Sequence, residues 1–136
     1  MATAQGLQRT FGTWSAVSLI SGAALWAGGR NDPARRFGRQ TFAWGVINAG
    51  IAAWTSSRPT PTTARLRRIL LVNAVADVGY MTVGAALYRK GLRPDGAAVM
   101  VQGAFLLALD THFAYHLDDN APPDPWDDVE PDALAG

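Results

Sequence analysis

Four long apolar stretches alternate with short connectors that hold most of the charges. The stretches lie at about 10–29, 37–56, 69–88 and 96–117. Each is about 20 residues long, which as an α-helix is enough to cross the hydrocarbon core of a bilayer. A water-soluble helical bundle instead carries charges regularly along its outer faces. The pattern therefore predicts an all-α fold, a four-transmembrane-helix bundle.

Capping signals precede the later stretches. Asp32-Pro33 predicts an N-cap and the first helical residue of the second helix, and Thr60-Pro61 repeats the signal for the third. Asp95 is the expected N-cap of the fourth helix. These signals predict that the helices begin in water, before the membrane.

Small and aromatic residues predict how the helices pack. Ser18 and Gly22 form a pair of small residues one turn apart, and Gly45 lies one turn before the buried position of Asn48. Such positions allow helix backbones to approach closely. Tryptophans near both ends of the first stretch, Trp14 among them, predict interfacial aromatic belts.

The domain boundary is predicted near residue 119. Residues 1–119 form one four-span membrane domain, and the first stretch is expected to be retained because no clear signal-cleavage site follows it. From Asp118 onward the chain has seven acidic residues, four prolines and no basic residue. Such a composition cannot bury enough apolar surface to fold, so 120–136 is predicted to be a disordered, acidic, proline-rich tail.

Composition excludes several classes of function. The chain has 136 residues, a net charge of +1 and no cysteine. There is no basic field to recruit nucleic acid, and no disulfide or thiolate chemistry. The sequence contains no phosphate-binding glycine loop, H-E-x-x-H or nucleophile-elbow serine, so no cofactor is predicted. Basic residues are divided too evenly between the connectors to decide the orientation in the membrane.

Polar residues inside the third stretch indicate a site within the bundle. Asn73, Asp77 and Tyr80 are spaced i, i+4 and i+7, so they share one face of a helix. A carboxyl group inside a membrane is costly and should face protein, water or a ligand.

Depth along the helices brings other polar residues to the same level. At 1.5 Å per helical residue, Asp77 and Asp110 differ in depth by roughly 3 Å, and Asn48 lies at a similar level. Gln102 lies nearer the opposite membrane face, where it is expected to contact the second helix. The predicted ligand-binding residues are Asn48, Asn73, Asp77, Tyr80, Gln102 and Asp110.

Paired aspartates allow three functions. Two neighbouring carboxyl groups at low dielectric do not both ionise cheaply, so one keeps its proton near neutral pH. That arrangement suits the binding of a small hydrophobic or cationic ligand, or of a partner helix. It equally suits an intramembrane enzyme, or a subunit of one, that acts on a lipid or isoprenoid with Asp77 or Asp110 as the general acid. The third possibility is a structural network in an accessory subunit of a membrane complex.

A histidine pair provides a further candidate site. His112 and His116 have the i, i+4 spacing that lets two imidazoles share one metal ion. They lie where the fourth stretch meets water, and no third ligand is evident. Packing at the interface is therefore favoured, and no metal is predicted.

Three short motifs resemble a known family. They are W-G-x-I-N from Trp44 to Asn48, N-x-x-x-D-x-x-Y from Asn73 to Tyr80, and Q-G-x-x-L from Gln102 to Leu106, followed by Asp110. Together they resemble small bacterial four-helix membrane proteins, an uncharacterised family described as a domain of unknown function. The resemblance implies a four-helix membrane fold and carries no activity. We expect a multi-pass protein of the plasma or inner membrane. The expected partners are the lipid bilayer, a small hydrophobic ligand and a homo- or hetero-oligomeric partner.

Overall fold

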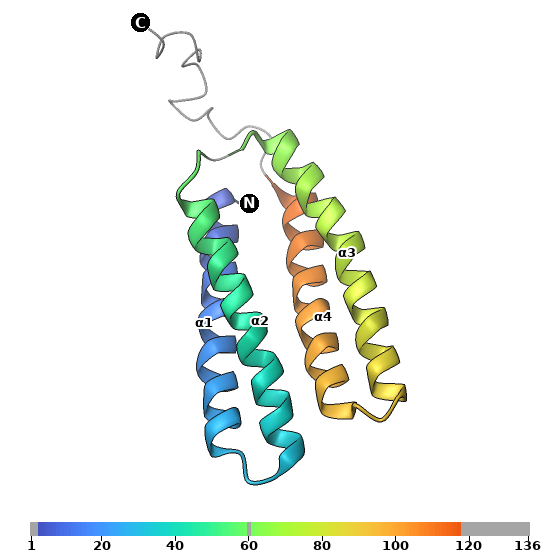
Figure 1. Cartoon of the computed structure of the whole chain (residues 1–136). Helices are drawn as coiled ribbons and strands as arrows, with labels where there is room; N and C mark the ends of the chain where they lie inside the picture. Colours follow the sequence, from blue (N-terminus) through green and yellow to red (C-terminus); the bar gives the residue numbers. More distant parts are fainter. Residues whose placement is uncertain (1–2, 60, 118–136) are drawn as a thin grey trace, which may run out of the picture.

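The chain folds into four long α-helices, confirming the all-α prediction. The computed structural model describes residues 3–59 and 61–117 (Figure 1). The helices are α1 (Ala4–Gly28), α2 (Asp32–Ser56), α3 (Thr63–Arg89) and α4 (Arg93–His116). Each begins earlier than the predicted apolar span, because polar residues in front of the span continue the helix. The predicted tail at 120–136 lies outside the described residues.

The helices form two antiparallel hairpins that lie side by side (Figure 1). α1 packs along α2, and α3 packs along α4. The hairpins meet mainly through α2 and α4, with a smaller contact between α1 and α4. α2 and α3 nowhere approach within 8 Å between Cα atoms. The two hairpins are therefore in contact where α2 meets α4, and the bundle is more open between α2 and α3.

Glycines let the backbones of the α1–α2 hairpin touch. A Cβ atom added to Gly38 would lie 2.5 Å from the Trp26 backbone nitrogen, and one on Gly45 would lie 2.8 Å from the Leu19 nitrogen. A Cβ on Gly22 would collide with the backbone of Phe42. The close packing predicted at Gly22 and Gly45 is confirmed.

Glycines also seal the α3–α4 hairpin. A Cβ atom on Gly96 would lie 2.5 Å from the Gly84 carbonyl oxygen and 2.6 Å from the Tyr88 nitrogen. Further along α4, a Cβ on Gly103 would lie 3.2 Å from the carbonyl oxygen of Asp77. This contact holds the backbone of α4 against the turn of α3 that carries Asp77.

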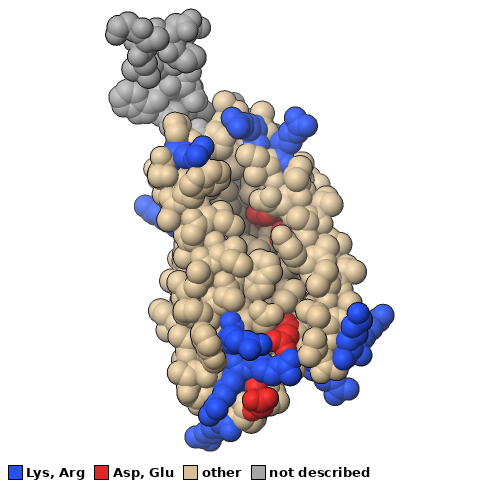
Figure 2. Space-filling view, in the orientation of Figure 1, with Lys and Arg blue, Asp and Glu red and all other residues tan. Residues whose placement is uncertain are grey.

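Polar side chains occupy the interior while large apolar ones face outward. The largest fully buried side chains are Gln102, Asn48 and Ser18. On the outer surface, Val75 is 75% exposed and Ile20 is 72% exposed. On the face shown in Figure 2, basic side chains gather at the two ends, and the broad belt between them holds none. This distribution is the reverse of a water-soluble bundle.

Two helices are long and apolar enough to cross a membrane by length and composition, namely α3 and α4. α1 and α2 do not meet that criterion. The four-helix bundle is thus confirmed, and the number of membrane spans stays a prediction.

The helix caps correct the sequence analysis in detail. α2 is capped by Asn31, whose side chain accepts a hydrogen bond of 3.0 Å from the Ala34 nitrogen, rather than by Asp32. α3 is capped by Thr62, which accepts from Arg65, and Thr60 is outside the described residues. At each start two capping residues lie one or two positions apart, Asn31 and Asp32 or Thr60 and Thr62, and the sequence does not decide between them.

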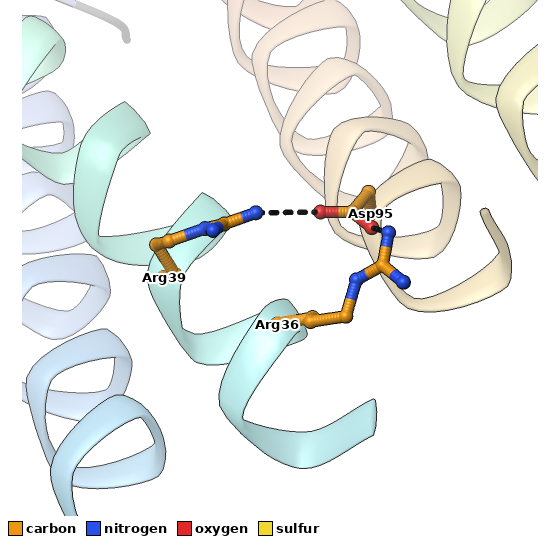
Figure 3. Close-up of polar contacts among 3 residues, drawn as sticks. All are labelled: Arg36, Arg39 and Asp95. Atoms are coloured by element: carbon orange, nitrogen blue, oxygen red, sulfur yellow. Dashed lines mark ion pairs between the residues drawn. The ribbon is translucent and has the colours of Figure 1, made fainter. Parts of the chain in front are cut away.

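Asp95 is not the cap of α4 but an ion-pair partner of α2. α4 begins at Arg93 without a side-chain cap, which places Asp95 in the first helical turn. Its carboxylate lies 2.6 Å from Arg36 Nη2 and 3.7 Å from Arg39 Nη2 (Figure 3). The helix N-terminus also favours a negative charge at this position. Asp95 therefore ties the start of α4 to the start of α2.

Candidate functional site

Asp77 and Asp110 meet inside the bundle. Asp77 lies in α3 and is 3% exposed, and Asp110 lies in α4 and is 6% exposed. Their carboxyl groups lie close enough to interact with each other. Two ionised carboxylates have acceptors and no donor and repel each other, so their proximity favours a state in which the pair holds one proton. The structure thus brings together the two aspartates that depth along the helices had placed at one level.

Asn73 completes this polar group. It lies one turn before Asp77 on α3, and its side-chain amide lies close enough to Asp110 to interact with it. Asp77 Oδ2 is buried and has no hydrogen-bond partner among the described residues. The acidic pair therefore has one amide partner from α3 and an oxygen that is free to accept a further donor.

A cavity opens beside the pair. Its volume is about 210 Å³, and it runs from the end of the bundle, near the start of α1, inward to Asn73 and Asp110. All four helices and the α2–α3 connector contribute to its walls, through Ala4, Leu7, Gln8, Phe11, Ile51, Thr55, Pro61, Leu66, Ile69, Leu70, Asn73, Leu109 and Asp110. Figure 2 shows a hollow between the hairpins with red carboxyl atoms inside it. The result is an apolar cavity with a carboxyl and an amide at its inner end, the usual composition of a small-molecule site.

Packed leucines and aromatic residues support the inner wall of the cavity. Leu70, Leu109 and Phe113 are buried in an apolar cluster, against which Leu7 and Phe11 of α1 pack. Arg67 fixes the neighbouring end of α4, since its guanidinium donates to the carbonyl oxygens of Ala114 and Leu117 at 2.9 and 3.3 Å. A cation at a helix C-terminus is electrostatically favourable.

Within the described part of the chain, no hydrogen bond joins the other predicted ligand residues to the acidic pair. Asn48 is buried in α2, but its Nδ2 has no partner among the described residues, so it donates to neither carboxyl group. Tyr80 makes an edge-on ring contact with Trp44, with centroids 5.3 Å apart. This ring pair bridges α3 and α2, whose backbones are not in contact.

Gln102 belongs to a separate network that joins the hairpins. Its Oε1 accepts a hydrogen bond of 2.8 Å from Trp14 Nε1, and its Nε2 donates to Ser18 Oγ at 3.1 Å. Both of these hydrogen-bond partners lie on α1, and the expected contact of Gln102 with α2 stays a prediction. The interfacial position predicted for Trp14 is wrong, since its ring stacks on Phe105 with centroids 3.8 Å apart.

The sequence analysis missed the contribution of α1 to the cavity. Leu7 and Phe11 line it, yet they precede or begin the predicted apolar span and carry no chemical signal. Their spacing of four residues, which places them on one helix face, was the one available indication.

The histidine pair packs on itself at the end of α4. The rings of His112 and His116 stack with centroids 4.6 Å apart, and His116 Nδ1 lies 2.8 Å from the His112 carbonyl oxygen. Within the part of the chain that the structure describes, no group of three or more metal-binding side chains occurs. Asp119, one turn beyond, is outside that part.

A family model matches residues 10–111 of the chain, three quarters of its length. The chain belongs to DUF6992, a family of unknown function. The matched DUF6992 region runs from early α1 to Thr111 and includes both aspartates of the buried pair. Neither the curated proteins nor the solved structures contain a match to the chain. The recognition of an uncharacterised family is confirmed, and the match brings no activity with it.

Proposed function

We propose that this chain is a four-span membrane protein that binds a small hydrophobic or cationic ligand in the cavity beside Asp110. The observation that carries the proposal is the cavity itself, apolar along its length and polar at its inner end. Asn73 and Asp110 are the polar groups at that end, and Asp77 lies behind Asp110. We place the protein in a cell membrane, either the plasma membrane or a bacterial inner membrane.

The outer surface supports insertion of all four helices. The helices have 24 to 27 residues, so each is about 36–40 Å long, more than the hydrocarbon thickness of about 30 Å. The exposed surfaces of α1 and α2 carry large apolar side chains, including Val17, Ile20, Val46 and Ile47. Burying a large apolar side chain is favourable by roughly 1.5–3 kcal/mol relative to leaving it in water, so contact with lipid removes a large free-energy cost.

The cavity is too large and too well built to be a packing defect. Closely packed interiors leave few voids larger than a water molecule, whereas about 150 Å³ is enough to hold benzene. A cavity of about 210 Å³ therefore accommodates a ring or a short alkyl group. The remaining part of a longer ligand would extend out of the cavity through its open end, near Thr55 and Pro61.

Two tryptophan substitutions on α3 test this function. Leu66→Trp projects an indole into the cavity, whereas Val72→Trp places it on the outer surface of the same helix, where Val72 is 63% exposed. We expect native mass spectrometry to detect a bound small molecule on the wild type and on Val72→Trp. In Leu66→Trp the bound fraction should fall roughly tenfold or more, which corresponds to a loss of about 1.4 kcal/mol or more.

The control for this test is the thermal unfolding midpoint, which should stay similar in both variants. A wild-type protein that carries no small molecule, or an adduct that survives unchanged in Leu66→Trp, contradicts the proposed binding role. A stable complex with another membrane protein in place of a small molecule would instead favour the accessory-subunit interpretation.

A further inference from the structure

The charges around the cavity favour one class of ligand. Among its lining residues Asp110 is the one that carries a titratable side chain, and none is basic. On α3, Asp77 lies behind Asp110. α1 and α2 line the cavity with apolar residues and with two uncharged polar residues, Gln8 and Thr55. The inner end is thus a buried site with acceptor oxygens and no positive charge among the described lining residues.

The basic residues of this end of the bundle lie outside the cavity walls. Arg67 of α3 packs against the end of α4, where it donates to main-chain carbonyls. Arg58, which follows α2, lies over the ring of Trp54, with its guanidinium carbon 4.2 Å from the centroid. Arg9, Arg65 and Arg68 are exposed. His112 of α4 is also exposed and stacks on His116. At the water-facing end such charges are screened over about 8–10 Å by physiological salt.

We propose, building on the ligand-binding function above, that the cavity takes a hydrophobic cation and releases a proton when it does so. The ammonium group of the ligand lies against Asp110, and its apolar part contacts Leu7, Phe11 and Leu70. The proton shared by Asp77 and Asp110 leaves to solvent as the cation arrives. One positive charge enters and one leaves, so the net charge of the buried site does not change.

The physical reason for the exchange is that the cation and the proton compete for the same pair of carboxyl groups. A single buried pair of carboxyl groups with one proton carries one negative charge, and a cation placed beside it favours ionisation of the second carboxyl. The cation then stabilises the negative charge on Asp77, whose Oδ2 is buried and has no hydrogen-bond donor among the described residues. A neutral ligand, in contrast, would hydrogen-bond to the pair and leave the proton in place.

Two probes of equal shape separate these cases. Benzyltrimethylammonium and its neutral carbon isostere neopentylbenzene differ in charge and hardly in size. We expect the cation to bind the purified full-length protein in detergent and to release about one proton per molecule bound at pH 7, measured with a pH-indicator dye in weak buffer. Its Kd should fall about tenfold for each pH unit gained in the range where the pair holds its proton.

Asp110→Asn should abolish both the proton release and the preference for the cation. Asp32→Asn is the matched control, because Asp32 is an exposed acid at the start of α2 that lies outside the cavity, and it should behave as the wild type. If both probes bind equally and no proton is released, the cation-exchange inference is wrong while the cavity remains a ligand site. If neither probe binds and no endogenous ligand is found, the proposed function itself fails.

Discussion

Gly96→Ala is expected to lower the thermal unfolding midpoint of the bundle sharply. The added methyl group would lie 2.5 Å from the Gly84 carbonyl oxygen and 2.6 Å from the Tyr88 nitrogen. Both neighbours are backbone atoms, so the two helices must separate to admit it. Overpacking of this kind costs about 3 kcal/mol. Intrinsic fluorescence of the five tryptophans gives the midpoint in detergent.

Gly79→Ala is the control for this prediction. Gly79 lies in α3, and a Cβ atom there would meet nothing within 4 Å. Alanine is favoured over glycine in a helix interior by up to about 1 kcal/mol, so the midpoint should stay the same or rise. Equal midpoints for Gly96→Ala and Gly79→Ala would show that α3 and α4 do not pack through Gly84 and Gly96.

Gln102→Leu is expected to loosen the contact between the hairpins. Leucine keeps most of the volume but removes the acceptor of Trp14 Nε1 and the donor to Ser18 Oγ. Gln102 is 1% exposed, so water does not replace the lost partners without entering the bundle. Leaving one buried donor unpaired costs about 1–3 kcal/mol, and we expect a total of about 2 kcal/mol.

Two further variants are compared with Gln102→Leu. Val101→Leu alters the neighbouring, half-exposed position of α4 and should have little effect. Trp14→Phe keeps an aromatic ring against Phe105 but removes the donor, so it should cost less than Gln102→Leu. A Gln102→Leu protein as stable as Val101→Leu would contradict the role assigned to this network.

The helices and their order were predictable from the sequence. Long apolar stretches separated by short charged connectors fix the number of helices and make neighbours antiparallel. The meeting of Asp77 with Asp110 followed for the same reason, because a short turn forces α3 and α4 to run back along each other. Depth along an antiparallel pair is set by residue count alone.

Rotation about the helix axes was not predictable to the same degree. Trp14 lies near the end of an apolar stretch, where an interfacial ring is the ordinary expectation, yet it points inward to Gln102. Asn48 lies at a depth similar to that of the aspartates, but its Nδ2 donates to neither. In helices with apolar residues on every side, hydrophobic periodicity is too weak to show which face is buried.

Side-chain contacts between different helices were also not predictable from the sequence. Asp95 has the residue type and position of a helix cap, and nothing nearby in the chain reveals that Arg36 and Arg39 reach it. The cavity was not predictable for the same reason. Its walls come from all four helices, and its existence depends on the gap between α2 and α3.

The most direct test of a polar-interior, four-span membrane bundle is the environment of its outer surface. The chain has no cysteine, so single spin labels can be placed through Val17→Cys, Ile47→Cys, Val75→Cys and Val101→Cys, one exposed position on each helix. In lipid bilayers we expect all four labels to be accessible to oxygen and shielded from a water-soluble nickel chelate. Labels on α1 and α2 that are open to the chelate, while those on α3 and α4 are shielded, would contradict the four-span account.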